Sequence, residues 1–227
     1  EGEYLCPECA GGRAAPRGPE QLARRAWEPR CAECSAELLP LPTREDKPLN
    51  PGSIYSVTKK DQEELCLVFG RAFAIPTVAL RFFNAYGPRQ SLSNPYTGVC
   101  AIFCSRHKNG EPPLIFEDGR QLRDFVHVSD VVQACLLALE NPDMDHQAFN
   151  VGSGQPITIL ELARTIQAAA GSPIPAQVTD RCRAGDIRHC FADVTRLKAM
   201  GYAPRVAIED GLRELLDWMR GQAAEDN

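Results

Sequence analysis

The sequence has no long apolar run and no large excess of positive charge. No stretch approaches the roughly 20 apolar residues that a membrane-spanning helix needs, so we expect no contact with a membrane. The first residues are acidic and polar and begin with neither Met nor a basic region, so we expect no signal peptide. The formal net charge of −5 argues against a broadly basic surface that binds nucleic acid.

Internal repeats and glycine-rich phosphate loops are also missing from the sequence. Dinucleotide-binding βαβ units use a glycine-rich turn directly after a strand to approach a pyrophosphate, and these 227 residues contain no such turn. The composition is otherwise ordinary for a globular protein, with 44% hydrophobic and 24% charged residues. A chain of this length can bury one or two modest cores.

Cysteine, in contrast, is abundant, and four of the ten cysteines form two C-x-x-C knuckles separated by 21 residues. They lie within residues 1–45, which show little apolar periodicity. This spacing is typical of a four-cysteine zinc ribbon, and bound metal would supply much of the folding free energy of such a segment. We therefore expect a surface insertion with a structural zinc ion; redox-inert pairs or adventitious disulfides are the alternative. The four expected ligands are Cys6, Cys9, Cys31 and Cys34.

Two of the scattered cysteines lie in apolar runs of the chain. Cys66 and Cys135 are most simply interpreted as small buried hydrophobic residues. We expect no secreted disulfide scaffold, because the chain is long and its helices look self-sufficient.

A tyrosine and a lysine stand four residues apart at the start of a helical pattern. Tyr55 and Lys59 would emerge on one face of a helix that Pro51 and Ser53 begin. An ammonium group one turn away favours the phenolate form of a tyrosine, so the pair can supply a general base. The alternative is an ordinary half-buried aromatic residue beside a solvated charge.

The remaining pattern alternates helices and strands. A helix is expected over residues 55–74, with Leu65, Val68, Phe69 and Ala72 as its apolar stripe. Residues 77–82 form a nearly continuous apolar run, which suits a strand of a parallel sheet buried on both faces. Further helices are expected over 20–27, 98–108, 129–140, 158–171, 193–200 and 207–220. Further strands are expected over 114–117, 124–128, 149–151 and 176–179; residues 38–51 are expected as an extended connector and 221–227 as a disordered tail.

Six motifs occur in one order along the chain: YSVTK (55–59), LRFFNAYGPR (80–89), LIFEDG (114–119), RDFVHVSD (123–130), FNVG (149–152) and RAGDIR (183–188). In this order and spacing they resemble the extended short-chain dehydrogenase/reductases, specifically the NAD-dependent nucleotide-sugar epimerases and dehydratases. The resemblance covers about residues 46–220. It implies that Tyr55 removes a proton from a sugar hydroxyl while hydride moves to NAD, and that Lys59 assists Tyr55 and binds the nicotinamide ribose. Phe82 is expected on the cofactor side of the site.

The resemblance also implies a set of substrate-binding residues. Asn84, Arg123 and Arg183 are expected at the diphosphate, although an asparagine at this position could simply cap a turn. The other expected residues are Phe116 at the base (or in the core), Asp186 at the ribose or at Arg183, and Cys190 where 4-epimerases place a residue whose bulk limits N-acetylated sugars. His127 is expected to be buried and structural.

The expected fold class is α/β: the C-terminal part of a Rossmann-like parallel sheet plus a small α/β substrate domain, with a zinc-ribbon-like insertion. The expected domains are the insertion (1–45), the late Rossmann-like part with the YxxxK helix (46–90) and a nucleotide-sugar-binding domain (91–227). The relatives begin with a glycine-rich NAD-binding half. We expect the chain to be either a fragment that lacks it or a product that has lost it.

An NAD-dependent nucleotide-sugar 4-epimerase of the UDP-hexose type is the favoured function. An NDP-sugar 4,6-dehydratase stays open, because the acidic pair that marks dehydratases would lie in the half that is not present. A non-catalytic sugar-nucleotide-binding remnant stays open as well. The expected partner is a UDP- or dTDP-hexose, with no nucleic acid and no membrane; the resemblance implies a cytoplasmic location and allows a homodimer that uses the Tyr55 helix.

Overall fold

The computed structural model describes residues 2–9, 13–92, 98–183 and 185–221. Their buried side chains form three hydrophobic clusters, one in the N-terminal segment and two in the α/β body. The expected tail over 221–227 lies almost wholly outside the described residues. Among the helices that are described, none has the length and apolar character needed to cross a lipid bilayer.

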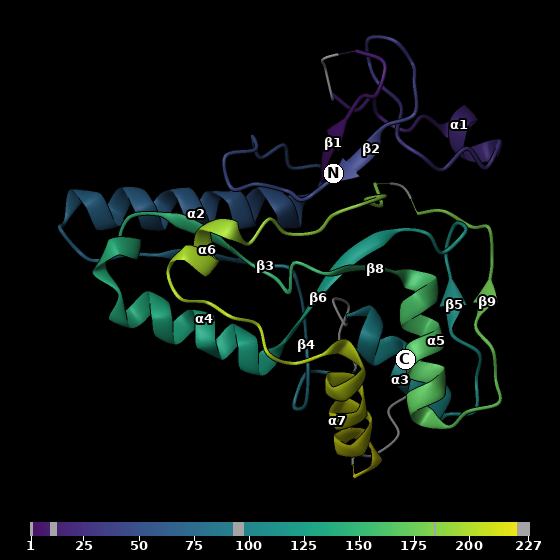
Figure 1. Cartoon of the computed structure of the whole chain (residues 1–227). Coiled ribbons are helices and arrows are strands. Elements are labelled where there is room, and N and C mark those ends of the chain that lie inside the picture. The colour runs from purple at the N-terminus through teal and green to yellow at the C-terminus, as the bar shows by residue number, and fades with distance from the viewer. Residues whose placement is uncertain (1, 10–12, 93–97, 184, 222–227) are drawn as a thin grey trace.

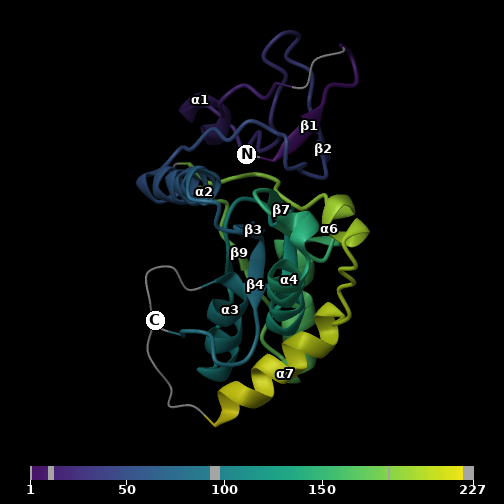
Figure 2. The ribbon, with the colours of Figure 1, turned by 90° about the vertical axis from the view of Figure 1, so that its left-hand side faces the viewer.

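The N-terminal segment, residues 2–45, stands above the α/β body (Figures 1 and 2). It contains β1 (Glu3–Leu5), α1 (Pro19–Ala23) and β2 (Leu39–Leu41), and the two strands pair antiparallel. Helix α1 ends well before residue 27, where the expected helix was to end. The expected extended connector instead begins with a paired strand. A small cluster of Tyr4, Cys6, Cys31 and Leu38 forms the core of this segment.

The first part of the body contains a parallel pair of strands. β3 (Ala79–Phe82) pairs in parallel with β7 (Ala148–Val151), which confirms the parallel arrangement expected for this run. The second cluster lies here, around Phe149 and Val151. Helix α2 (Ile54–Ala72) lies along this part in Figure 1, and α4 (Val128–Glu140), η1 (Pro142–Met144) and α6 (Thr195–Ala199) complete it.

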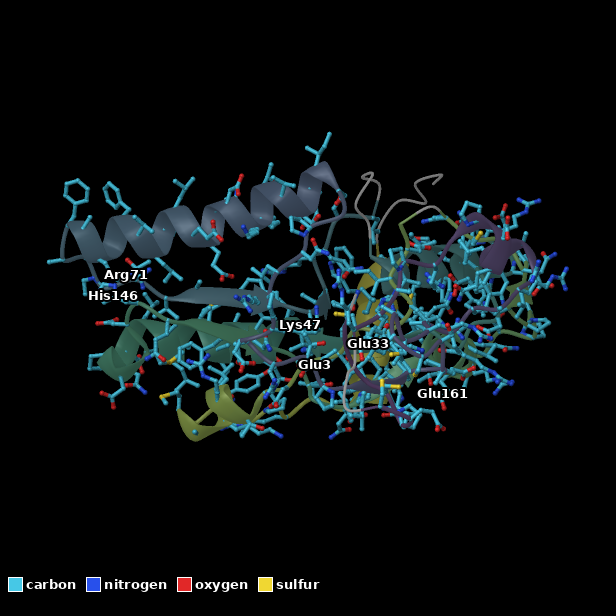
Figure 3. The ribbon with its side chains drawn as sticks, turned by 90° about the horizontal axis from the view of Figure 1, so that it is seen from above. Glu3, Glu33, Lys47, Arg71, His146 and Glu161 are labelled. Atoms are coloured by element: carbon cyan, nitrogen blue, oxygen red, sulfur yellow. The ribbon has the colours of Figure 1, made fainter. Side chains whose placement is uncertain are left out.

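The apolar stripe of α2 is exposed to solvent. Leu65 is 68% exposed, Val68 and Phe69 are also exposed, and Gly70 is the one buried residue of the helix. Figure 3 shows side chains along α2 standing away from the rest of the molecule. Cys66 on the same helix is exposed, so the expectation of a buried cysteine is wrong there. The residues of β3 are also only partly buried, which differs from the strand buried on both faces that its sequence predicts.

The second part of the body carries the larger hydrophobic cluster. β4 (Asn84–Tyr86) and β6 (Leu122–His127) pair in parallel, β8 (Pro156–Thr158) joins β6 antiparallel, and β5 (Leu114–Ile115) pairs in parallel with β9 (Gln177–Val178). Helices α3 (Val99–Lys108), α5 (Ile159–Ala170) and α7 (Ile208–Arg220) pack together below this sheet (Figure 1). The mixture of parallel strands and covering helices is the α/β Rossmann-like class that the sequence predicts.

Helix ends follow local chemistry. Thr158 and Glu161 form the predicted capping box at the start of α5, and Gly171 ends that helix with a φ of 62°, a left-handed conformation that glycine adopts at low cost. At the start of α4 the cap is His127, whose side chain accepts from the Ser129 amide, and not Ser129 or Asp130 as the sequence suggested.

Candidate active site and cysteine cluster

The first turn of α2 carries the expected catalytic tyrosine. The Ser53 side chain accepts a hydrogen bond from the Ser56 amide at 3.1 Å, and the Ser56 hydroxyl accepts from the Ser53 amide at 2.9 Å. This reciprocal cap satisfies two amide groups that would otherwise lack partners at the helix start. The helix therefore begins at Ile54, and Tyr55 and Lys59 lie on successive turns.

The two side chains lie on one face of the helix, as their spacing predicts. The Lys59 ammonium is 5.7 Å from the centroid of the Tyr55 ring and donates a hydrogen bond to Gln62 at 3.1 Å. Tyr55 is 54% exposed, so its phenol is open to a ligand and is not enclosed in the core. The pair can present a hydroxyl and a positive charge to one bound molecule.

A largely buried ion pair anchors this helix to the neighbouring strand. The Arg81 guanidinium on β3 binds the Glu63 carboxylate with two hydrogen bonds of 2.7 and 2.6 Å, and it also donates to the Glu45 carbonyl. Hydrogen bonding to Glu63 raises the pKa of Arg81 and outweighs the opposite effect of burial. At the other end of the helix, Arg71 donates to the His146 carbonyl, and these two residues lie side by side in Figure 3. Sequence analysis quoted Arg81 within a motif but gave it no role.

Two expected ligand-binding residues flank the junction between β3 and β4, which are consecutive in the chain and belong to different sheets. Phe82 is the last residue of β3 and is 49% exposed. Asn84 begins β4, opposite Phe125 of β6, and is partly buried. Ligands of open α/β sheets bind outside the carboxyl ends of the strands, so Phe82 lies where this rule places a cofactor or a substrate.

The aromatic ring and the arginine expected at the nucleotide lie in direct contact. The Arg183 guanidinium lies over the Phe116 ring at 4.1 Å from its centroid. Phe116 follows β5, whereas Arg183 comes from the loop after β9, so two distant segments form this contact. A flat guanidinium stacked on a ring keeps its hydrogen-bond donors free at the edge for phosphate oxygens.

Arg123 makes contacts with the backbone of the protein itself. Its guanidinium donates to the Ile187 carbonyl, to the Arg188 carbonyl at 3.0 Å and to the Leu122 carbonyl at 2.8 Å. The side chain therefore holds the backbone of the loop that carries Arg183. The structure thus gives Arg123 a positioning role, and its expected contact with a diphosphate stays a prediction.

The same loop carries the last two expected substrate residues. The Asp186 amide donates to the Arg183 carbonyl at 3.2 Å. Cys190 is partly buried, its amide donates to the Leu122 carbonyl, and burial raises the pKa of its thiol. Asp186 and Cys190 therefore belong to one structured segment beside β6.

Sequence analysis missed the residue at the centre of this loop. Arg188 is fully buried and its guanidinium binds three carboxylates, those of Glu28, Glu117 and Asp118. Burial alone would lower the pKa of Arg188, but its hydrogen bonds to Asp118 and Glu28 raise it. Arg188 ends the RAGDIR motif, and a second arginine in so short a motif was the signal that could have drawn attention to it.

His127 is buried, as the sequence suggested. Its Nδ1 atom lies 2.8 Å from the Ser129 hydroxyl, and its Nε2 atom lies 3.4 Å from the Glu214 carboxylate. Its ring packs edge-on against Tyr86. These contacts are those of a structural histidine inside the fold.

The four cysteines of the two knuckles converge. The Cys6 and Cys34 sulfurs are 3.4 Å apart, and the Cys9 sulfur lies 3.6 Å from that of Cys31 and 3.7 Å from that of Cys34. A tetrahedral zinc site with Zn–S bonds of ~2.3 Å has sulfurs ~3.8 Å apart, whereas a disulfide joins them at ~2.05 Å. The Cys34 and Glu33 amides lower the pKa of the Cys31 thiol to about 7, which favours a thiolate there. Against the lowering effect of the Ala36 amide, the pKa of the Cys34 thiol is raised by its hydrogen bond with Cys6, by burial and by Cys31. The residues present therefore fit a four-thiolate zinc ion and not a pair of disulfides.

Comparison with known proteins places the chain in a family. The model of the NAD dependent epimerase/dehydratase family matches residues 30–152. The dTDP-L-rhamnose 4-epimerase of Burkholderia thailandensis is 35% identical over 213 residues, which cover 93% of this chain and 57% of that protein. An alignment of this length has to extend into residues 1–45.

Solved structures agree with the sequence comparison. The UDP-N-acetylglucosamine 4-epimerase of Methanobrevibacter ruminantium, in complex with UDP-N-acetylmuramic acid, has a TM-score of 0.75 and 35% identity, and covers 81% of this chain and 58% of that chain. The UDP-glucose 4-epimerase of Thermus thermophilus, in complex with NAD, has a TM-score of 0.73 and 30% identity over 87% of this chain and 61% of that chain. The chain thus spans a little over half the length of these relatives. The chain belongs to the NAD dependent epimerase/dehydratase family.

Proposed function

We propose that these 227 residues supply the catalytic pair and the nucleotide-sugar lobe of an NAD-dependent 4-epimerase that acts on a UDP- or dTDP-hexose. The observation that carries the proposal is the exposed phenol of Tyr55 with the Lys59 ammonium on the same helix face. The Phe116–Arg183 contact supports a nucleotide site in the second part of the body.

The residues present fit the nicotinamide end of NAD. Tyr55, Lys59 and Phe82 are all exposed, and a dinucleotide can reach the first two from one side of α2. A glycine-rich turn for the pyrophosphate does not occur in these residues, so that part of the cofactor has to be held by other residues. NAD would supply the hydride acceptor, and later the hydride donor, for the sugar C4.

The chain's own residues have separate roles in this proposal. The Tyr55 phenolate takes the proton of the C4 hydroxyl and later returns it, and the Lys59 ammonium stabilises the phenolate and donates to the nicotinamide ribose. Arg183 and Asn84 hold the diphosphate while Phe116 packs against the base. Arg123 and Asp186 hold the loop in place around them.

Cys190 bears on the choice of sugar. Its side chain is small, so we propose that the site accepts an N-acetylhexosamine as well as a hexose, and the likeness to a UDP-N-acetylglucosamine 4-epimerase supports this. A Cys190→Tyr variant should lose turnover of UDP-N-acetylglucosamine and keep turnover of UDP-glucose; equal turnover of both sugars by the variant would contradict the assignment.

The cysteine cluster is proposed to hold a structural zinc ion. Cys6, Cys9, Cys31 and Cys34 fill all four positions of a tetrahedral ion, so no position is open for a substrate or an activated water.

The proposed domains remain the segment up to residue 45, the YxxxK part (46–90) and the nucleotide-sugar part (91–227). A homodimer that uses α2 is also proposed, since Leu65, Val68 and Phe69 form an exposed apolar stripe. A Leu65→Glu variant should then be monomeric in light scattering.

Substitution at Tyr55 tests the catalytic assignment. In the enzyme supplied with an NAD-binding half, Tyr55→Phe should abolish turnover and leave binding of the nucleotide sugar unchanged, because only the phenol oxygen is removed. Product analysis separates the alternatives: a 4-epimer supports the proposal, whereas a 4-keto-6-deoxy sugar supports a dehydratase. Unchanged turnover in the Tyr55→Phe variant, or binding without turnover in the unsubstituted enzyme, would overturn the proposal.

A further inference from the structure

One carboxylate of the N-terminal segment binds two consecutive residues of the loop over residues 185–190. Glu28 accepts from the Arg188 Nε and Nη2 atoms at 3.0 and 2.5 Å, and its second oxygen lies 2.7 Å from the His189 Nε2 atom. Burial would raise the pKa of Glu28, but the hydrogen bonds with His189 and Arg188 outweigh it and lower the pKa to about 2. The carboxylate is therefore ionised at any working pH and holds two consecutive residues of the loop.

A second side chain of the segment reaches the same loop. Arg17 donates to the Asp186 carbonyl at 2.5 Å and to the Glu117 carboxylate at 2.7 Å. The Gly2 amide donates to the His189 carbonyl at 2.9 Å, and a Cβ added to Gly2 would lie 2.5 Å from that oxygen. The chain after β9 passes directly under the segment in Figure 1, as these contacts require.

The contact is buried and ionic. Arg188 has no exposed surface and Glu117 is 1% exposed. Glu117 also has a φ of 52°, a left-handed conformation that an L-residue holds only when its surroundings enforce it. Removal of one carboxylate from this group takes charge-assisted hydrogen bonds away from a buried guanidinium, which is unfavourable. The network therefore keeps the segment and the loop in one arrangement.

The cysteine cluster in turn holds the residues that make these contacts. The Ala15 amide donates to the Arg30 carbonyl and the Ala32 amide donates to the Arg13 carbonyl, so the stretch before Arg17 pairs with the stretch after Glu28. Cys31 lies in the second stretch, three residues after Glu28. A metal ion that joins the two knuckles fixes both stretches at once.

The loop held in this way carries the proposed diphosphate ligand. Arg183 stacks on Phe116, which directly precedes Glu117. From the other side, Arg123 binds the carbonyls of residues 187 and 188. The loop thus lies between Arg123 of the body and side chains of the segment, Glu28 and Arg17 among them.

We propose that the metal-held N-terminal segment is a positioning element for the nucleotide-sugar loop, with Glu28 and Arg17 as the positioning residues. They hold residues 185–190 in the conformation that presents Arg183 to a diphosphate. The ligand named here rests on the function proposed above, whereas the link from metal to loop does not depend on it.

Hydrogen exchange on the zinc-loaded 227-residue chain tests the link. Glu28→Gln should leave the zinc content unchanged and raise exchange of the amides of residues 186–190 on the order of ten-fold or more, because hydrogen bonds to a charged group are lost. A metal chelator should produce the same rise in the unsubstituted chain. Exchange in α3 should stay unchanged in both cases. Glu20→Gln is the matched control, since Glu20 is an exposed carboxylate of the same segment.

Calorimetry with UDP and with dTDP tests the consequence for binding. Glu28→Gln should weaken the affinity for UDP and dTDP by a factor similar to the rise in hydrogen exchange. Glu28→Asp should restore part of this affinity. If Glu28→Gln lowers the zinc content, the Arg17→Lys variant is used for both measurements in its place. Lysine keeps the positive charge but lacks the guanidinium fork that reaches both Asp186 and Glu117. The positioning role is overturned if the amides of residues 186–190 exchange at the same rate in Glu28→Gln as in Glu20→Gln. It is also overturned if their exchange rate does not change when zinc is removed. Failure of UDP and dTDP to bind the unsubstituted chain refutes the proposed function and leaves the exchange result standing.

Discussion

Substitution of Glu63 should loosen the helix that carries Tyr55. Glu63 and Arg81 form two short hydrogen bonds between α2 and β3, and their side chains are 15% and 22% exposed. Most apolar side chains of α2 are exposed to solvent, so the ion pair is a large part of what holds the helix in place. The Glu63→Gln change keeps the size of the side chain and removes its charge.

The expected loss is about 2 kcal/mol in the free energy of unfolding. A hydrogen bond to a charged group contributes about 1.5–3 kcal/mol, and a bidentate arginine–carboxylate pair lies in the strong part of that range. The neighbouring residue provides the control. Glu64 pairs with Lys60 at 3.0 Å, but its side chain is 58% exposed, and an exposed i,i+4 pair contributes only about 0.3–0.5 kcal/mol. Glu64→Gln should therefore cost several-fold less than Glu63→Gln.

Urea unfolding followed by circular dichroism measures both variants in the zinc-loaded chain. The midpoint should fall for Glu63→Gln at an unchanged slope, since the surface exposed on unfolding does not change. Hydrogen exchange over residues 54–72 should rise in the same variant. Equal losses for Glu63→Gln and Glu64→Gln would refute the reasoning, because the largely buried pair would then contribute no more than the exposed one.

Three further outcomes are expected. The chain should bind about one zinc ion by mass spectrometry of the metal content, Cys34→Ser should lose it, and Cys66→Ser should keep it; retained zinc in Cys34→Ser would contradict the four-cysteine site. The pKa of Glu28 is lowered from 4.5 to about 2, so its contribution to stability is complete above pH 4.5 and is lost as pH falls toward 2. Glu28→Gln should therefore flatten the acid unfolding curve between these two pH values. An unchanged curve would count against the pairing of Glu28 with Arg188 and His189. Gly152→Ala should cost about 1–3 kcal/mol, because its Cβ would lie 2.5 Å from an Asp124 oxygen, whereas Gly52→Ala has open space and should be nearly neutral in the same unfolding assay.

Local signals accounted for most of the helices. The capping box of Thr158 and Glu161 and the left-handed Gly171 were readable because each involves neighbours within one helical turn. The shared face of Tyr55 and Lys59 was predictable for the same reason. The convergence of the two C-x-x-C knuckles was also predictable, since metal ligation imposes its own geometry on a recognisable spacing.

Long-range pairing was not predictable from the same signals. Nothing near Arg188 in the chain indicates that its guanidinium binds Glu28, 160 residues away. Arg123 was expected to meet a ligand, and only the folded loop shows that its donors bind backbone carbonyls. The positions of charged residues along the sequence do not indicate which of them pair with each other in a buried network.

The exposure of α2 could not be predicted from its amphipathic pattern. A stripe such as Leu65, Val68 and Phe69 indicates that a helix has an apolar side, but the pattern does not specify what covers it. Within the residues that the structure describes, nothing buries this side. β3 also has an apolar sequence that predicts more burial than the structure gives it: its first three residues are only partly buried, and in the described part of the chain it pairs only with β7.

The ionic network between the segment and the loop has a consequence for the order of folding. Its contacts join residues 160 positions apart in one case and 100 positions apart in another. Contacts of such large sequence separation form slowly, because the chain must first restrict a long intervening loop. We therefore expect the two knuckles to capture metal and the α/β body to collapse as separate events, with their docking as the last step toward the native state.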